Sequence, residues 1–134
     1  MSVLPPRMDN PMPKTKKNPE REHRIEDEII VDAYGPEEQA MGWYYYLEKK
    51  LQFPFPATCI AERETSPLRK GEKVEILGMA PEDQCQHEMF VKIRWEKRGL
   101  AVPLSQLKPI AGADEETREA VADWYYWVDQ GYLL

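Results

Sequence analysis

The segment Phe53-Pro54-Phe55-Pro56 constrains the fold more than any other feature of this sequence. Proline lacks the amide hydrogen that helices require, and it disfavours helical geometry in the preceding residue. Apolar residues recur at helical spacing before this segment and again after residue 113, whereas they alternate with polar residues between. A chain of 134 residues is too short for two ordinary domains. We therefore expect one α+β domain with a helical region (21–52), a β region (53–113) and a C-terminal helix (114–131).

The helical region contains a second interruption, at Gly35-Pro36. The apolar spacing predicts a first helix over residues 21–34. Pro36 suits the first position of a second helix, which would run to Leu51. Either two helices meet at a sharp elbow or one helix is kinked there. The residues expected to be buried on the second helix are Met41, Tyr44 and Tyr45.

The β region contains five short segments bounded by turn residues. A four-residue turn (96–99) is expected between the third and fourth segments, and a tight turn (105–107) just before the fifth. This pattern predicts a small, five-stranded, SH3-like antiparallel barrel, flanked by the N-terminal kinked helix or helix pair and by the C-terminal helix. The predicted strands lie within residues 57–63, 71–80, 89–95, 100–104 and 108–110.

The C-terminal helix has recognisable ends. Asp114 is a suitable N-cap, and Gly131 is a suitable stop. The aromatic runs at 43–46 and 124–127 are expected to pack the helices on the barrel and on each other. The apolar stripe of this last helix is predicted to consist of Val121, Trp124, Tyr125 and Val128.

Residues 1–20 are rich in proline, lysine and methionine and show no apolar period, so we expect a disordered tail there. They lack the apolar core of a secretory signal, and no run in the chain approaches the ~20 apolar residues that span a bilayer. The two cysteines, Cys59 and Cys85, do not form a disulfide framework. These features favour a cytoplasmic protein with no membrane association.

The net charge of −6 is unevenly distributed along the chain. Residues 25–52 and residues 114–134 each have an excess of five acidic over basic side chains, whereas the central region is nearly neutral. An uneven distribution of charge indicates what a protein can bind, but it does not indicate how the chain folds. Nucleic acid is not expected to be a partner, because an acidic protein repels the phosphate backbone.

Catalytic motifs are missing from the sequence. There is no nucleophile–base pair with an orienting residue and no phosphate-binding glycine loop, so an enzyme is not expected. Cys85 and His87 could contribute to a soft-metal site, but a structural zinc site needs four nitrogen or sulfur ligands. Chance loop composition explains this pair better.

Two acidic clusters could bind calcium, which takes about 6–8 oxygen ligands in irregular geometry. No EF-hand loop is present. At the elbow, Asp32, Glu37 and Glu38 surround the interruption between the two predicted helices. On the last helix, Glu115, Glu119 and Asp123 form a column of like charge at intervals of four, which a cation would stabilise. The alternative is that these carboxylates only complement helix ends and solvated faces.

The string DAYGPEEQAMGWYYYLEKKLQFPF (32–55) resembles the opening segment of the CcbP-type family of cyanobacterial calcium-binding proteins and their bacterial relatives. A looser likeness extends over about residues 25–130. The resemblance implies a small Ca²⁺-binding protein without an EF-hand. It also implies that Asp32 and Glu38, with Glu37 beside them, contribute acidic ligands. Gly35-Pro36 departs from the family, since relatives often have further acidic residues there.

Two functional hypotheses follow. The first is a cytoplasmic Ca²⁺ buffer or sensor whose ligands are Asp32, Glu37 and Glu38, completed by Glu28 or by Glu119 and Asp123. The calcium-loaded form could also bind a protein partner, which the sequence does not identify. The alternative is an SH3-like interaction module that binds a peptide or nucleic acid. Its basic edge would consist of Lys92, Arg94, Lys97 and Arg98.

Overall fold

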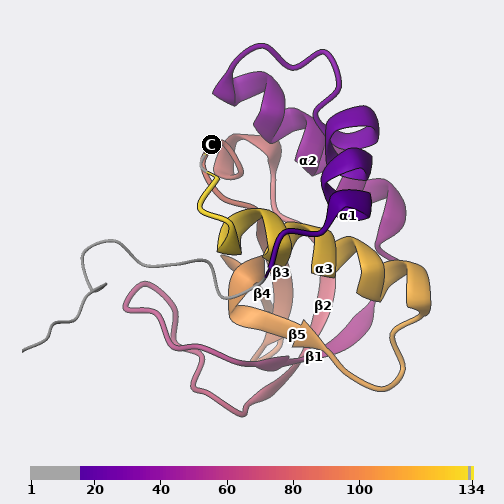
Figure 1. Ribbon diagram of the computed structural model, residues 1–134. Coiled ribbons are helices and arrows are strands. Elements are labelled where there is room, and N and C mark those ends of the chain that lie inside the picture. Colours follow the sequence, from indigo (N-terminus) through magenta and orange to yellow (C-terminus); the bar gives the residue numbers. More distant parts are fainter. Residues whose placement is uncertain (1–15, 133) are drawn as a thin grey trace, which may run out of the picture.

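The computed structural model describes residues 16–132 and 134 and shows an α+β domain (Figure 1). Most of the predicted tail, residues 1–15, lies outside the described residues. Helix α1 (Pro19–Arg24) begins inside the segment predicted as tail, with Asn18 as its N-cap. Figure 1 shows α3 between the sheet below it and α1 and α2 above it. No helix in the described part of the chain combines the length and apolarity needed to cross a bilayer.

The N-terminal helical region forms two helices with an elbow rather than one kinked helix. α1 continues directly into a π-helix, η1 (Ile25–Ile29), in which the amide of Ile30 bonds to the carbonyl of Ile25. Asp32 then has a φ of 61°, in the left-handed region, so the first helix ends before the predicted residue 34. α2 (Pro36–Lys50) begins with Pro36 at its first position, as predicted.

Five antiparallel strands form one open sheet in the order β4-β3-β2-β1-β5. β5 is three residues long and pairs with β1, while β4 pairs with β3 at the opposite edge. The SH3-like barrel that we predicted is not confirmed, because the sheet is not closed, whereas the five-stranded antiparallel sheet is confirmed. The strands are β1 (Phe55–Cys59), β2 (Lys73–Met79), β3 (Phe90–Trp95), β4 (Arg98–Pro103) and β5 (Leu107–Pro109).

The connections differ in part from those expected. Glu96 and Lys97, with φ values of 47° and 74°, form a two-residue hairpin turn in place of the four-residue turn. A 3₁₀ turn, η3 (Leu104–Gln106), precedes β5 where a tight turn was predicted. A second one, η2 (Glu82–Gln84), lies between β2 and β3.

α3 (Glu115–Asp129) has the predicted ends: the Asp114 carboxylate accepts a hydrogen bond from the amide of Thr117 at 2.8 Å, and Gly131 follows with a φ of 90°. The two aromatic runs pack the helices together. The ring centroid of Trp43 on α2 lies 5.1 Å from that of Trp124 and 5.6 Å from that of Trp127, both on α3.

The buried faces of α2 and α3 agree only in part with those predicted. Tyr44, Val121 and Trp124 are buried as expected. Tyr45 is 52% exposed and Val128 is 39% exposed, although both were expected in the core. Trp43 and Trp127 are buried instead. Runs of consecutive aromatic residues carry little helical periodicity, so the sequence could not select among them.

The approach of η1 to α2 requires glycine at position 42. A Cβ at Gly42 would overlap the main-chain carbonyl oxygen of Ile29, which cannot move as a side chain can. We predict that Gly42→Ala lowers the free energy of unfolding by about 1–3 kcal/mol, the usual cost of overpacking. Urea denaturation measures this. Gly78→Ala is the matched control, since a Cβ there meets no atom within 4 Å, and an equal loss in both variants would contradict the proposed contact.

Candidate metal centre

The elbow between η1 and α2 presents its acidic side chains to solvent. The side chains of Asp32 and Glu37 are exposed and have neither a hydrogen bond nor an ion pair with any described residue. Glu38 is also exposed, but its Oε1 accepts a hydrogen bond from the amide of Tyr34 at 2.6 Å. The Glu38 side chain therefore bonds to the backbone just before α2, as an acidic residue in the first turn of a helix often does. The carboxylates of Asp32 and Glu37 remain available to bind a metal ion.

Glu28 is exposed on η1, and its charge acts on Tyr46 of α2. Burial raises the pKa of Tyr46 well above its ordinary value. The hydrogen bond to Asp123 and the negative charges of Asp123 and Glu28 raise it further, while Arg24 opposes them. Glu28 is thus close enough to Tyr46 for its charge to act on the hydroxyl.

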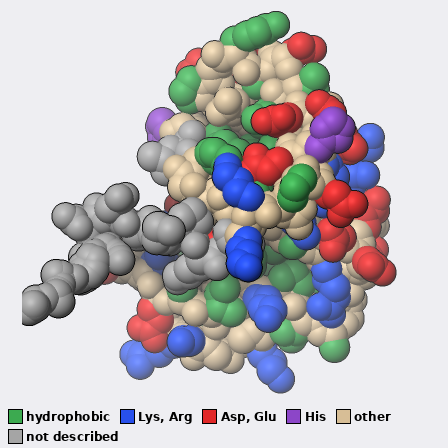
Figure 2. Space-filling view, in the orientation of Figure 1, with side chains coloured by type: hydrophobic (Ala, Val, Ile, Leu, Met, Phe, Trp, Pro, Cys, Tyr) green, Lys and Arg blue, Asp and Glu red, His purple; other side chains and the backbone are tan. Residues whose placement is uncertain are grey.

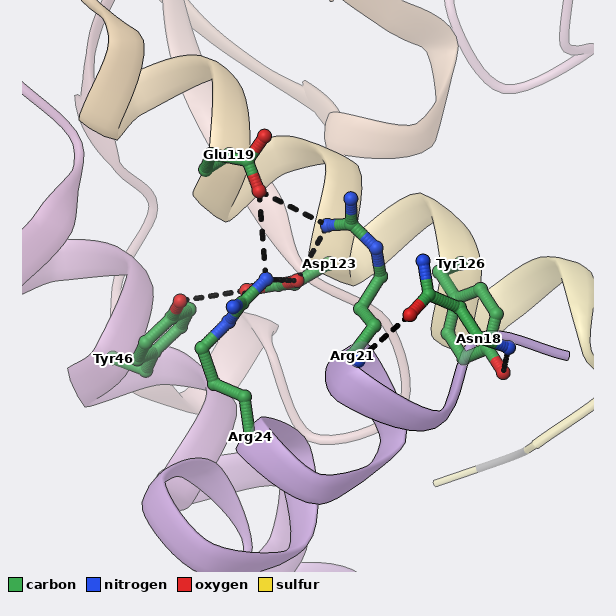
Figure 3. Close-up of polar contacts among 7 residues, drawn as sticks. All are labelled: Asn18, Arg21, Arg24, Tyr46, Glu119, Asp123 and Tyr126. Atoms are coloured by element: carbon green, nitrogen blue, oxygen red, sulfur yellow. Dashed lines mark hydrogen bonds and ion pairs between the residues drawn. The ribbon is translucent and has the colours of Figure 1, made fainter.

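Asp123 is fully buried, and its carboxylate joins all three helices (Figure 3). Its Oδ1 accepts hydrogen bonds from Arg21 Nη1 at 2.6 Å and from Arg24 Nη2 at 2.7 Å. Its Oδ2 accepts hydrogen bonds from Arg24 Nε at 3.0 Å and from the Tyr46 hydroxyl at 2.7 Å. Two guanidinium groups thereby neutralise a carboxylate that would otherwise be costly to bury. We name this arrangement the Asp123 clasp, consisting of Arg21, Arg24, Tyr46 and Asp123.

Glu119 lies one turn before Asp123 and faces the same arginines. Its Oε1 is 3.5 Å from Nη1 of Arg21 and 3.5 Å from Nη2 of Arg24, and its side chain is about half exposed. The repulsion predicted between Glu119 and Asp123 is therefore relieved by the arginines that both of them contact. Glu119 and Asp123 contact arginines and not the carboxylates of the elbow.

The arginines of the clasp were missed in the sequence. Their signal was Asp123 itself, which lies among Val121, Trp124 and Trp127, all buried on α3. A carboxylate on an apolar helix face needs a buried cationic partner. Arg21 and Arg24, three residues apart on one helix, could have been suggested as that partner.

The oxygen donors of the elbow fit a hard cation such as Ca²⁺ in kind. Among the described residues, however, no group of three or more His, Cys, Asp or Glu side chains is arranged to hold a metal ion. The elbow carboxylates would therefore have to converge on the ion. Cys85 is no soft-metal ligand in this state, because it is buried, its sulfur accepts a hydrogen bond from the Phe90 amide, and burial raises the pKa of its thiol.

The basic edge considered in the alternative hypothesis is partly neutralised. Lys92 and Arg94 are exposed on β3, and Nε of Arg94 lies 2.9 Å from a carboxylate oxygen of Glu75 on β2. On the side of the molecule seen in Figure 2, acidic side chains lie mainly over the upper part, where the helices are. Basic side chains lie mainly over the lower part.

Comparison with known proteins identifies the family. Residues 23–128 match the family model for CcbP, described as calcium binding. The chain belongs to the CcbP calcium-binding family. The crystal structure of Anabaena CcbP is 43% identical, with a TM-score of 0.79 over 90% of this chain and 98% of that chain. No curated protein sequence matches.

A second solved structure, a calcium-binding protein in its calcium-binding form, is 42% identical, with a TM-score of 0.76 over 87% of this chain and 94% of that chain. The predicted membership of the CcbP family is thus confirmed, and calcium as the ligand is confirmed at the level of the family. These relatives share the α+β architecture described above.

We predict that Asp123→Ala destabilises the protein by about 3 kcal/mol, because it leaves two partly buried guanidinium groups without their counterion. Glu119→Ala, on the same helix, should cost less than about 1 kcal/mol, since its ion pairs are longer and solvated. Urea denaturation of both variants measures the difference. An equal loss of unfolding free energy in the two variants would show that the hydrogen bonds of Asp123 contribute no more than the ion pairs of Glu119.

The raised pKa of Tyr46 predicts a loss of stability in alkali. Above pH 10, the ordinary value, the unfolded chain loses the Tyr46 proton while the folded protein keeps it, so the free energy of unfolding falls by up to about 1.4 kcal/mol per pH unit. Tyr46→Phe should make the decline between pH 9 and pH 11 less steep. Tyr34→Phe is the control, because Tyr34 is 88% exposed, and it should leave the slope unchanged. Identical slopes in the wild type and Tyr46→Phe would contradict this assignment.

Proposed function

We propose that this protein binds Ca²⁺ at the elbow between η1 and α2 and acts as a cytoplasmic calcium buffer or sensor. The observation that carries the proposal is that Asp32 and Glu37, in a member of a calcium-binding family, are exposed and uncommitted at one interruption of the chain. Glu38 and Glu28 supply further oxygens on either side. The protein would be a binding protein and not an enzyme.

The acidic column of α3 is placed outside the proposed site. Both oxygens of Asp123 accept hydrogen bonds from cationic or hydroxyl donors, so a metal ion would have to displace two arginines. Glu119 shares the same arginines. The elbow carboxylates have no such competitors, which favours them as ligands even though Glu119 and Asp123 were candidates in the sequence.

Binding at the elbow would bring like charges together around the ion. Exposed side chains can converge at little steric cost, but ordering them costs conformational entropy. Calcium tolerates the irregular geometry that results better than Mg²⁺ does, because Mg²⁺ requires near-octahedral coordination. The proposed site should therefore prefer Ca²⁺.

Calorimetric titration of metal-free protein tests the proposal. We predict saturable Ca²⁺ binding, much weaker Mg²⁺ binding, and a loss of affinity of about tenfold or more in the double variant Asp32→Asn/Glu37→Gln, since two charged ligands are removed. At a hundredfold excess over the dissociation constant, Ca²⁺ should stabilise the fold by about 2.7 kcal/mol.

Two variants serve as controls for this titration. Glu64→Gln removes an exposed carboxylate from the loop between β1 and β2, and Glu119→Gln removes one from α3. Both variants should keep the wild-type affinity for Ca²⁺. If Glu119→Gln weakened binding while the elbow variant did not, the ion would belong on α3. If none of the variants had an effect, the placement would be wrong.

The alternative of a peptide-binding or nucleic-acid-binding module has weaker support. The ion pair between Arg94 and Glu75 reduces the positive charge of the β3 edge, and the protein as a whole is acidic. Nucleic-acid binding requires a net surplus of positive charge along the contact surface.

A further inference from the structure

A small cavity is lined by residues of α1, η1, α2, α3 and the segment after α3, and none of Asp32, Glu37 and Glu38 lines it. Its volume is about 280 Å³, near the lower limit for cavities that hold organic ligands. Its polar lining consists of the carboxylates of Glu22 and Glu26 and the side-chain amide of Gln39. No lysine or arginine is among its lining residues.

The rest of the wall is apolar and aromatic. Trp127 and Tyr132 line one side, with ring centroids 5.7 Å apart, and two isoleucines, Ile25 and Ile30, line another. A bare metal ion gains nothing from such a wall, because Ca²⁺ requires six or more oxygens. A cation with a hydrocarbon part can use both the carboxylates and the aromatic faces.

Lys17 of the protein itself makes the interactions expected of such a cation with two residues that line the cavity, Tyr132 and Glu22. Its ammonium lies 5.4 Å from the centroid of the Tyr132 ring, donates a hydrogen bond to the Tyr132 hydroxyl at 2.9 Å, and lies 3.5 Å from Oε2 of Glu22. The Lys17 side chain is 68% exposed and is not among the residues that line the cavity.

The two carboxylates differ in their availability. Glu22 accepts hydrogen bonds from the hydroxyls of Tyr126 at 2.6 Å and Tyr132 at 3.1 Å, which fix it as a charged group. Burial alone would raise its pKa, but these hydrogen bonds, together with Lys17, lower it below the ordinary value. The side chain of Glu26 is exposed and has no hydrogen bond or ion pair within the described part of the chain. Glu26 can therefore pair with an incoming cation.

We propose that this cavity binds a small primary alkylammonium ion, with its charge beside the two glutamates and its hydrocarbon chain against the aromatic wall. Three ammonium hydrogens can be shared among the carboxylates and the Gln39 carbonyl oxygen. The site goes beyond the proposed calcium site and does not depend on it.

The test uses n-butylammonium as the probe and the full-length protein, followed by calorimetry and by the NMR signal of the Gln39 side-chain amide. We expect saturable binding that shifts this signal, whereas butan-1-ol, which has the same chain without the charge, should not bind. Glu26→Gln should weaken binding roughly five- to tenfold, because it removes a charged hydrogen-bond acceptor. Glu20→Gln, a matched change on an exposed residue of α1 outside the cavity, should leave binding unchanged.

Two further variants sharpen the result. Lys17→Met should strengthen binding, since it removes the intramolecular competitor for Glu22 and Tyr132. Asp32→Asn/Glu37→Gln should retain alkylammonium binding, which separates this proposal from the calcium proposal. Equal weakening by Glu20→Gln and Glu26→Gln would overturn the inference and indicate only general charge attraction. Binding of butan-1-ol as tight as that of n-butylammonium would also overturn it.

Discussion

The buried carboxylate of Asp123 is the interaction on which the helical half of this protein depends. It lies on α3, yet its partners come from α1 and α2, so a single side chain fixes the relative positions of three helices. A carboxylate in this environment is tolerated only because cations and a hydroxyl satisfy both of its oxygens. The orientation of η1, and hence of the elbow that follows it, depends on this clasp.

The clasp also explains why the two acidic segments, residues 25–52 and 114–134, differ in how available their carboxylates are to a cation. Glu119 and Asp123 of α3 contact arginines, whereas Asp32 and Glu37 of the elbow face solvent. The net charge counted along the sequence is the same in both segments, but the carboxylates of Glu119 and Asp123 are paired with arginines and those of Asp32 and Glu37 are not. This contrast supports the elbow as the place for a hard cation.

Most of the fold could be predicted from local signals. The ends of α2 and α3 followed from Pro36, Asp114 and Gly131, and the strands followed from alternation and turn residues. Sheet closure could not be predicted, because it depends on whether β4 and β5 meet across the sheet. The arginine partners of Asp123 were missed for a similar reason, since they are about 100 residues distant in sequence. The elbow residues could be proposed as ligands from the sequence because they lie together in the chain, and their role in binding stays a prediction.

The π-helix η1 has a consequence for length variation in this family. Its wide turn contains one residue more than an α-turn, as the bond from the Ile30 amide to the Ile25 carbonyl shows. A homologue with one residue fewer in this stretch could form an ordinary α-turn and still present the flanking residues to the same neighbours. We therefore expect a single-residue deletion to be accommodated here without separating α1 from α3 or η1 from α2. Alignments of relatives should place gaps within this turn rather than in the elbow itself.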